Sequence, residues 1–187
     1  MILEQRNGLV GLFDLDGTLA DYDTAMTRDI KLLLPPDYQD WRSYQDQDFI
    51  KNLIKLIRSQ PGWWTRLARL EDGFLLLALM KELGFNLNIL TKGPYNHPNS
   101  WSEKVIWCKE NVPDIPITVT EDKSLVYGKV LVDDYPPYII GWLEHRPRGM
   151  VIMPDRAWNE GFEHPQVIRY KKNLSEISER LKLLFNA

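Results

Sequence analysis

With 187 residues, the chain suits one domain, or one domain that carries a small inserted cap. Its 44% hydrophobic and 26% charged residues are typical of a globular protein and exclude a disordered or fibrous chain. The formal net charge of -3, without a long basic run, excludes the usual electrostatic footprint of a protein that binds a nucleic acid polymer.

The first predicted element is a buried strand, an apolar run from Leu9 to Phe13. Asp14 and Asp16 follow it directly, and side chains two residues apart lie on the same side of an extended chain. The first carboxylate can serve as nucleophile and metal ligand, and the second as general acid and base. This pairing is the chemistry of an aspartyl-phosphate enzyme.

The next segment, residues 20–69, has no convincing strand. It shows helical periodicity around Phe49 to Ile57, a Pro35-Pro36 break and a Pro61-Gly62 turn. We therefore predict a small helical cap inserted after the first strand.

From residue 70 onward, strand-like runs alternate with helical ones, which indicates a parallel sheet with helices on its faces. The sequence predicts further strands at Leu87 to Leu90, Ile117 to Thr120, Val130 to Val132 and Met150 to Met153. It predicts helices at Asp72 to Leu83, Ser100 to Glu110, Pro136 to His145 and Leu174 to Phe185. The predicted α/β core comprises residues 1–19 and 70–187, and the cap comprises residues 20–69.

Reactive side chains also follow three of the later strands. Thr91 and Lys92 follow one, Lys123 follows the next, and Asp133 and Asp134 follow another. Because ligands of open parallel sheets bind beyond the carboxyl ends of the strands, we expect these side chains to meet at one edge. Together with the first acidic pair, they supply what phosphoryl transfer requires.

The acidic side chains predict a Mg2+ site, because Mg2+ prefers hard oxygen ligands and retains several waters. Asp14, the backbone carbonyl of Asp16, and a carboxylate from Asp133 or Asp134 would suffice as ligands. The sequence leaves open which of the last two acids contacts the metal.

A lysine is expected to neutralise the phosphate oxygens and to keep the clustered acids from repelling one another. Lys123 is favoured over its rival Lys104, which falls inside a predicted helix rather than near a strand end. Thr91 would hold the phosphoryl group beside this lysine. Catalysis is thus assigned to these two residues together with Asp14 and Asp16.

The motifs in this order resemble the haloacid dehalogenase-like phosphatases, and within them the 5'(3')-deoxyribonucleotidases. The resemblance is carried by DLDGTLADYD at 14–23, PGWW at 61–64, ILTKGP at 89–94 and TEDKSLV at 120–126, followed by KVLVDDYP. It implies a Rossmann-like three-layer core with a small helical cap, and hydrolysis of nucleoside monophosphates with Mg2+ as cofactor. Another small phosphomonoester, such as a sugar phosphate, is the alternative substrate, and a non-catalytic phosphate-binding protein is a further one.

The same resemblance implies a substrate pocket. Tyr22 and the cap residues Trp63 or Trp64 would face the nucleobase. Lys92 is included among the substrate-binding residues with Asp16, Thr91 and Lys123, although relatives commonly carry a small hydroxyl residue at position 92.

The remaining expectations concern location and partners. Cys108 is the only cysteine, so an intrachain disulfide is excluded and a reducing cytoplasm is the default location. No apolar stretch approaches the ~18 residues that span a bilayer, so we expect no membrane association. The expected partner is a small nucleoside monophosphate, and a homodimer is kept open.

Overall fold

The computed structural model describes residues 8–38 and 40–185, which form a six-stranded sheet in which every pair of neighbouring strands is parallel. The strands are β1 Val10–Phe13, β2 Asn86–Lys92, β3 Ile117–Thr120, β4 Val130–Val132, β5 Met150–Pro154 and β6 Val167–Tyr170. Their spatial order is β3-β2-β1-β4-β5-β6. The chain order therefore reverses beside β1, and such a switch point is where ligands bind in open α/β sheets.

Six α-helices accompany these strands in the described residues, and the last of them follows β6. They are α1 Tyr22–Leu33, α2 Asp48–Arg58, α3 Glu71–Glu82, α4 Pro98–Asn111, α5 Pro136–Glu144 and α6 Leu174–Phe185. Single 3-10 turns occur at Pro36–Tyr38, Trp41–Tyr44, Trp64–Arg66, Lys123–Leu125 and Ala157–Asn159. None of the helices in the described part of the chain is long and apolar enough to cross a membrane.

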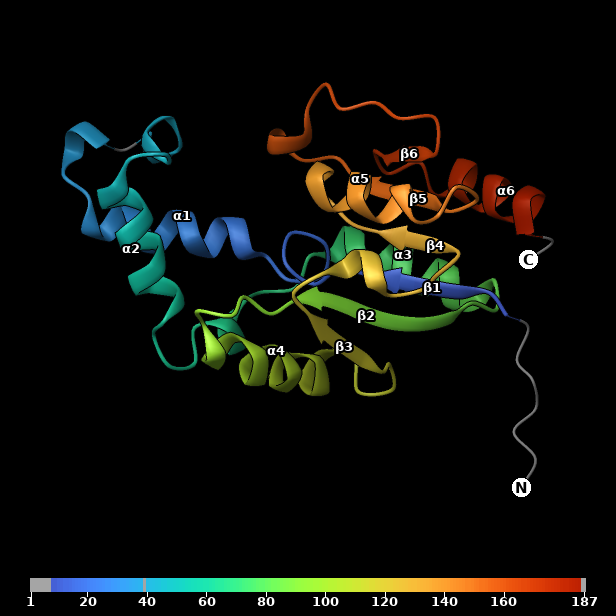
Figure 1. Ribbon diagram of the computed structural model, residues 1–187, viewed down its shortest axis with the longest axis horizontal. Coiled ribbons are helices and arrows are strands. Elements are labelled where there is room, and N and C mark those ends of the chain that lie inside the picture. Colours follow the sequence, from blue (N-terminus) through green and yellow to red (C-terminus); the bar gives the residue numbers. More distant parts are fainter. Residues whose placement is uncertain (1–7, 39, 186–187) are drawn as a thin grey trace.

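The helices form a layer on each side of the sheet (Figure 1). Because side chains alternate along a strand, neighbouring residues of β1 enter different cores. Phe13 packs in the larger core with side chains of α3, α4 and α6, whereas Leu12 packs in a smaller core with Ile139 and Trp142 of α5. The α/β three-layer prediction is confirmed.

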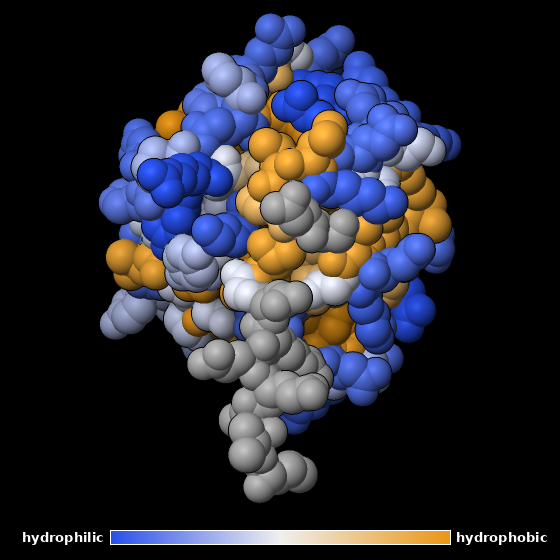
Figure 2. Space-filling model, turned by 90° about the vertical axis from the view of Figure 1, so that its right-hand side faces the viewer, coloured by the Kyte–Doolittle hydropathy of each residue, from blue (hydrophilic) through white to orange (hydrophobic). Residues whose placement is uncertain are grey.

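The ends of the sheet differ in character. The strands point toward α1 and α2, which lie beyond their carboxyl ends (Figure 1). At the other end, hydrophobic side chains gather near the centre of the visible face and are ringed by hydrophilic ones (Figure 2). The boundaries given to the cap, residues 20–69, stay a prediction, although α1 and α2 both fall within them.

The structure adds two elements to those expected. The strand β6 extends the sheet at its edge, and α1 begins directly after the first acidic loop. The strand was missed because its four residues include Arg169 and are mostly half-buried, so they lack the apolar run typical of a central strand. The other predicted strands and helices are present within a few residues of their expected bounds.

Candidate active site

The acidic loop after β1 is held at the switch point of the sheet. The Asp14 amide donates to the carbonyl of Val132 at 2.8 Å, which ties the end of β1 to β4. Gly17 turns the chain with φ +78°, and a Cβ there would lie 2.5 Å from Oδ2 of Asp134. The turn therefore requires glycine both for its backbone conformation and for the close approach of this carboxylate.

Three carboxylates meet beyond the strands β1 and β4. Asp14, Asp133 and Asp134 are all buried, and each offers an oxygen within 4.8 Å of the others. Lys123 enters the same group: its Nζ lies 2.6 Å from Asp14 Oδ1 and 2.7 Å from Asp133 Oδ2. The strand-end residues that the sequence predicted to meet do lie together.

Burial and mutual repulsion disturb the ionisation of this group. Burial raises the pKa of Asp14 well above its usual range, against the opposing effect of Lys123. Burial, with the nearby Asp133, also raises the pKa of Asp134 to about 7. One ammonium faces three carboxylates, so the fully ionised group carries an excess of two negative charges that a divalent cation could neutralise.

A second buried lysine lies on the other side of the acidic loop. Lys104 Nζ is 2.5 Å from Asp16 Oδ2, 3.2 Å from Thr91 Oγ1 and 2.7 Å from the backbone carbonyl of Lys92. Its side chain is 2% exposed. Lys123 and Lys104 therefore both occupy the site, one beside each acid of the first pair, and the choice between them was unnecessary.

The sequence did contain a signal for Lys104. It precedes the buried residues Trp107 and Cys108 by three and four positions, so it lies on the apolar face of α4. A lysine on such a face is either a solvent-reaching side chain or a buried charge with a partner. Here the partner is Asp16, which belongs to a loop 88 residues away in the chain.

The backbone carbonyl of Lys92 accepts a hydrogen bond from Lys104, but the Lys92 side chain lies against Tyr138. Its Nζ lies 5.1 Å from the centre of the Tyr138 ring, which also faces Lys123 Nζ at 4.9 Å. These three residues line a cavity of about 250 Å³ between the segment that follows β3 and the helix α5. A substrate-binding role for Lys92 stays a prediction.

The aromatic residues expected at the nucleobase pack against one another. Tyr22 stacks on Trp64 with ring centres 5.7 Å apart and meets the edge of Trp63 at 5.4 Å. Both indole side chains are 3% exposed, and their Nε1 atoms donate to Asp29 and to the carbonyl of Arg58. Of these three residues only Tyr22 is half-buried rather than buried, and the base-stacking role stays a prediction.

Three side chains that the sequence had not assigned to the site donate hydrogen bonds to Asp134. Trp158 Nε1 donates to its Oδ2 at 2.8 Å, and Thr18 Oγ1 donates to its Oδ1 at 3.0 Å. Asn159 donates to the Asp134 carbonyl at 2.8 Å. Thr18 lies inside the DxDGT motif and could have been included, whereas nothing in the sequence distinguished Trp158.

Comparison with solved structures shows which proteins share this fold. Solved structures with the same fold include a haloacid dehalogenase-type hydrolase of Bacillus subtilis bound to magnesium (TM-score 0.60, 16% identity, 92% of this chain and 98% of that one). Another is CbbY of Rhodobacter sphaeroides in complex with phosphate (TM-score 0.52, 14% identity, 90% and 95%). The chain therefore has the fold of the haloacid dehalogenase-type hydrolases.

The particular family follows from sequence comparison. Residues 8–172 match the family model described as 5' nucleotidase, deoxy (pyrimidine), cytosolic type C protein, so the chain belongs to that family. A Bordetella bronchiseptica protein provisionally named a 5'(3')-deoxyribonucleotidase is 27% identical over 162 residues, which are 79% of this chain and 84% of that protein. Its Bordetella pertussis counterpart is 26% identical over the same coverage. The protein is a phosphatase of the deoxynucleotidase type.

Proposed function

We propose that the protein hydrolyses nucleoside monophosphates, with deoxyribonucleotides preferred, in a Mg2+-dependent reaction through an aspartyl-phosphate. The observation that carries this proposal is the placement of the first acidic pair. Asp14 contacts Lys123 within the carboxylate group, while Asp16 contacts Lys104 beside Thr91. Each acid thus has an environment suited to a different task.

Asp14 is the nucleophile in this mechanism. Its carboxylate attacks phosphorus in line with the ester oxygen, a P–O bond to Asp14 forms, and the bond to the leaving oxygen breaks. Asp16 gives the proton that the leaving oxygen needs. Its Oδ1 is buried without a hydrogen-bond partner among the described residues, so no described protein group competes for this oxygen.

Water then hydrolyses the aspartyl-phosphate. Asp16, now ionised, accepts a proton from the attacking water, and inorganic phosphate leaves with Asp14 restored. Lys123, Lys104 and Thr91 lie around the first acidic pair and supply positive charge and hydrogen bonds to the phosphoryl oxygens. Because their positions are fixed by burial, they stabilise the transition state without reorganising.

The donor set fits Mg2+. Asp14 and Asp133 or Asp134 would hold the ion with hard carboxylate oxygens, and the carbonyl of Asp16 would complete the protein ligands. The uncompensated negative charge of the buried carboxylates matches a divalent cation. When bound, Mg2+ would neutralise phosphate charge during the attack.

A nucleobase would meet the aromatic group of Tyr22, Trp63 and Trp64. Tyr22 is half-buried and stacks on Trp64, and membership of the deoxynucleotidase family favours a base as its partner. The near-complete burial of both tryptophans favours the second candidate, a phosphatase for a smaller phosphomonoester such as a sugar phosphate, because neither indole face is open.

The test is phosphate release from a panel of substrates. Deoxyribonucleoside and ribonucleoside 5'-monophosphates, 3'-monophosphates, sugar phosphates and p-nitrophenyl phosphate would be compared with Mg2+ and with EDTA, with Asp14→Asn as the blank. We expect Mg2+-dependent turnover concentrated on deoxynucleotides and its loss in the variant. Turnover of sugar phosphates alone would support the second candidate, and near wild-type activity of Asp14→Asn would remove the proposed mechanism.

A further inference from the structure

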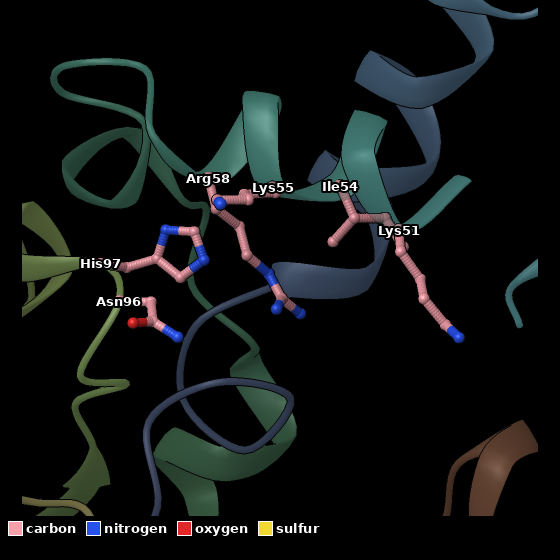
Figure 3. Close-up of a pocket in the computed structure, with 6 residues that line it drawn as sticks. All are labelled: Lys51, Ile54, Lys55, Arg58, Asn96 and His97. Atoms are coloured by element: carbon pink, nitrogen blue, oxygen red, sulfur yellow. The ribbon is translucent and has the colours of Figure 1, made fainter. Parts of the chain in front are cut away.

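A cavity of about 300 Å³ lies between the helix α2 and the loop that follows β2. Lys51, Ile54, Lys55 and Arg58 line it from α2, and Asn96 and His97 line it from the loop. Figure 3 shows Asn96 and His97 facing the α2 side chains across this space, with the Arg58 guanidinium extending between the two sides. The catalytic roles assigned above use none of these residues.

The cavity has a strongly positive lining. Lys51, Lys55 and Arg58 supply three cationic groups, and no carboxylate lines the cavity. None of the three belongs to an ion pair in the part of the chain that the structure describes. Burial first, and then Arg58 and Lys55, lower the pKa of His97, as expected for an imidazole that faces these two cations across the cavity.

The partner that Arg58 does have leaves its charge uncompensated. Arg58 Nε donates to the Tyr22 hydroxyl oxygen at 2.7 Å, and Nη2 donates to the same oxygen. Burial raises the pKa of Tyr22 to about 12, so this phenol is neutral at physiological pH. The arginine is therefore held in place by a neutral group and keeps its full positive charge.

The start of helix α4 adds to this field. His97 is the residue that precedes the helix, its side chain makes no capping hydrogen bond, and the first turn contains no acidic residue. The partial positive charge of the helix N-terminus is thus left without a protein anion beside the cationic side chains. The cavity combines two independent sources of positive potential.

The spacing of the cations indicates the size of the ligand. Lys51, Lys55 and Arg58 lie at positions i, i+4 and i+7 of α2, so they share one face over a length of about 10 Å. A single monoanion would pair with one of them. A group with several negative charges, such as two linked phosphates, would reach more than one.

The cavity is also close to the proposed catalytic centre. The Arg58 guanidinium lies 5.1 Å from the centre of the Tyr22 ring, and Tyr22 stacks on Trp64. Lys104 Nζ in turn lies 4.5 Å from the centre of the Trp64 ring and 2.5 Å from Asp16 Oδ2. Contacts through Tyr22 and Trp64 therefore link the cavity residue Arg58 to Lys104, which contacts the catalytic loop.

We propose that this cationic cavity binds a phosphate group other than the one that is hydrolysed. The group belongs either to the substrate, as the second phosphate of a nucleoside bisphosphate, or to a separate phosphate-bearing anion. The first source rests on the proposed nucleotidase function, whereas binding itself does not.

The binding test uses inorganic pyrophosphate and the full chain in EDTA at low ionic strength. The variant Lys51→Gln/Lys55→Gln removes two exposed cations from the cavity, and Lys81→Gln/Lys109→Gln removes two exposed cations elsewhere. We expect pyrophosphate to bind about tenfold more weakly to the first variant and normally to the control. Equal affinity in both variants, whether normal or reduced, overturns the proposal.

The ring resonances of His97 give a readout that depends on the site and not on turnover. The chain has only three histidines, so the NMR spectrum contains three sets of imidazole signals, and the set that is lost in His97→Gln belongs to His97. We expect pyrophosphate to shift the His97 resonances of the wild type and not those of Lys51→Gln/Lys55→Gln. A His97 signal that does not respond in the wild type overturns the proposal even if pyrophosphate binds.

Kinetics distinguish the two sources. The quantity to compare is the ratio of kcat/KM for a deoxynucleoside 3',5'-bisphosphate to kcat/KM for the 5'-monophosphate. A lower ratio in Lys51→Gln/Lys55→Gln than in the wild type supports a substrate phosphate. An unchanged ratio, together with weakened pyrophosphate binding, supports a separate anion. If the protein hydrolyses no nucleotide but the His97 response is present, the proposed function fails while the anion site stands.

Discussion

Lys104 Nζ lies 2.5 Å from Asp16 Oδ2 and reaches Thr91 and the Lys92 carbonyl with the same ammonium group. One buried cation on α4 therefore joins the acidic loop after β1 to the end of β2. This contact holds the proposed general acid in place and sets a positive charge where phosphoryl oxygens would lie. It makes Lys104 the first residue to test.

Lys104→Met keeps the length of the side chain and removes its charge. We expect kcat/KM for nucleoside monophosphates to fall about 100-fold or more, because a preorganised cation is lost from the transition state. Steady-state kinetics would measure this, with the exposed Lys109→Met of the same helix as the matched control. A Lys104→Met protein with normal fold and normal kcat/KM would contradict the assignment.

Removal of the metal is expected to destabilise the fold. Asp14, Asp133 and Asp134 repel one another when ionised, and Mg2+ binding would relieve this repulsion in the native state only. At 100 times its dissociation constant, Mg2+ would add about 2.7 kcal/mol to the free energy of unfolding, or about 5–10 °C in Tm. Thermal unfolding with Mg2+ and with EDTA measures the difference.

The control for this experiment is Asp134→Asn, which removes one negative charge from the group. The Mg2+-dependent rise in Tm should shrink in this variant, and its Tm in EDTA should equal or exceed that of the wild type. An unchanged Mg2+ response would show that Asp134 is not a metal ligand.

Trp158 is expected to position Asp134 for metal binding. Trp158→Phe keeps an aromatic ring and removes the indole N–H that donates to Asp134 Oδ2 at 2.8 Å. The Mg2+ concentration at half-maximal activity should rise about 10-fold to 100-fold, while kcat at saturating Mg2+ stays near normal. Trp41→Phe in the cap segment serves as control. A fall in kcat that excess Mg2+ does not restore would argue against a positioning role.

Cys108 is expected to be unreactive in the native protein. Burial, with a further contribution from Asp16, raises the pKa of its thiol to about 12, so little thiolate forms at pH 8. Burial disfavours the thiolate only in the folded state. Cys108 therefore leaves the free energy of unfolding unchanged below about pH 9 and lowers it as the pH rises from 9 toward 12.

The measurement is labelling with a thiol-specific disulfide reagent at pH 8. Native protein should react far more slowly than protein unfolded in urea. Cys108→Ala should also lose less stability than the wild type when the pH rises from 9 to 11. Rapid labelling of the native chain would contradict the buried, protonated thiol.

Much of the sheet and of the acidic group could be predicted because both depend on local patterns. Apolar runs such as Val130 to Val132 are typical of central parallel strands, and the residues that follow such strands meet at one edge whatever the details of packing. For this reason Asp14, Lys123, Asp133 and Asp134 were expected together and lie together. The short edge strand β6 lacked that pattern.

Other parts of the site depend on how helices and loops pack. Lys104 and Trp158 reach the acids from α4 and from the turn after β5, and the rotation of those segments decides where their side chains point. The cationic cavity likewise exists only because α2 lies against the loop that contains His97. The sequence by itself determined the chemistry at the strand ends, whereas tertiary packing decided which distant cations and donors surround it.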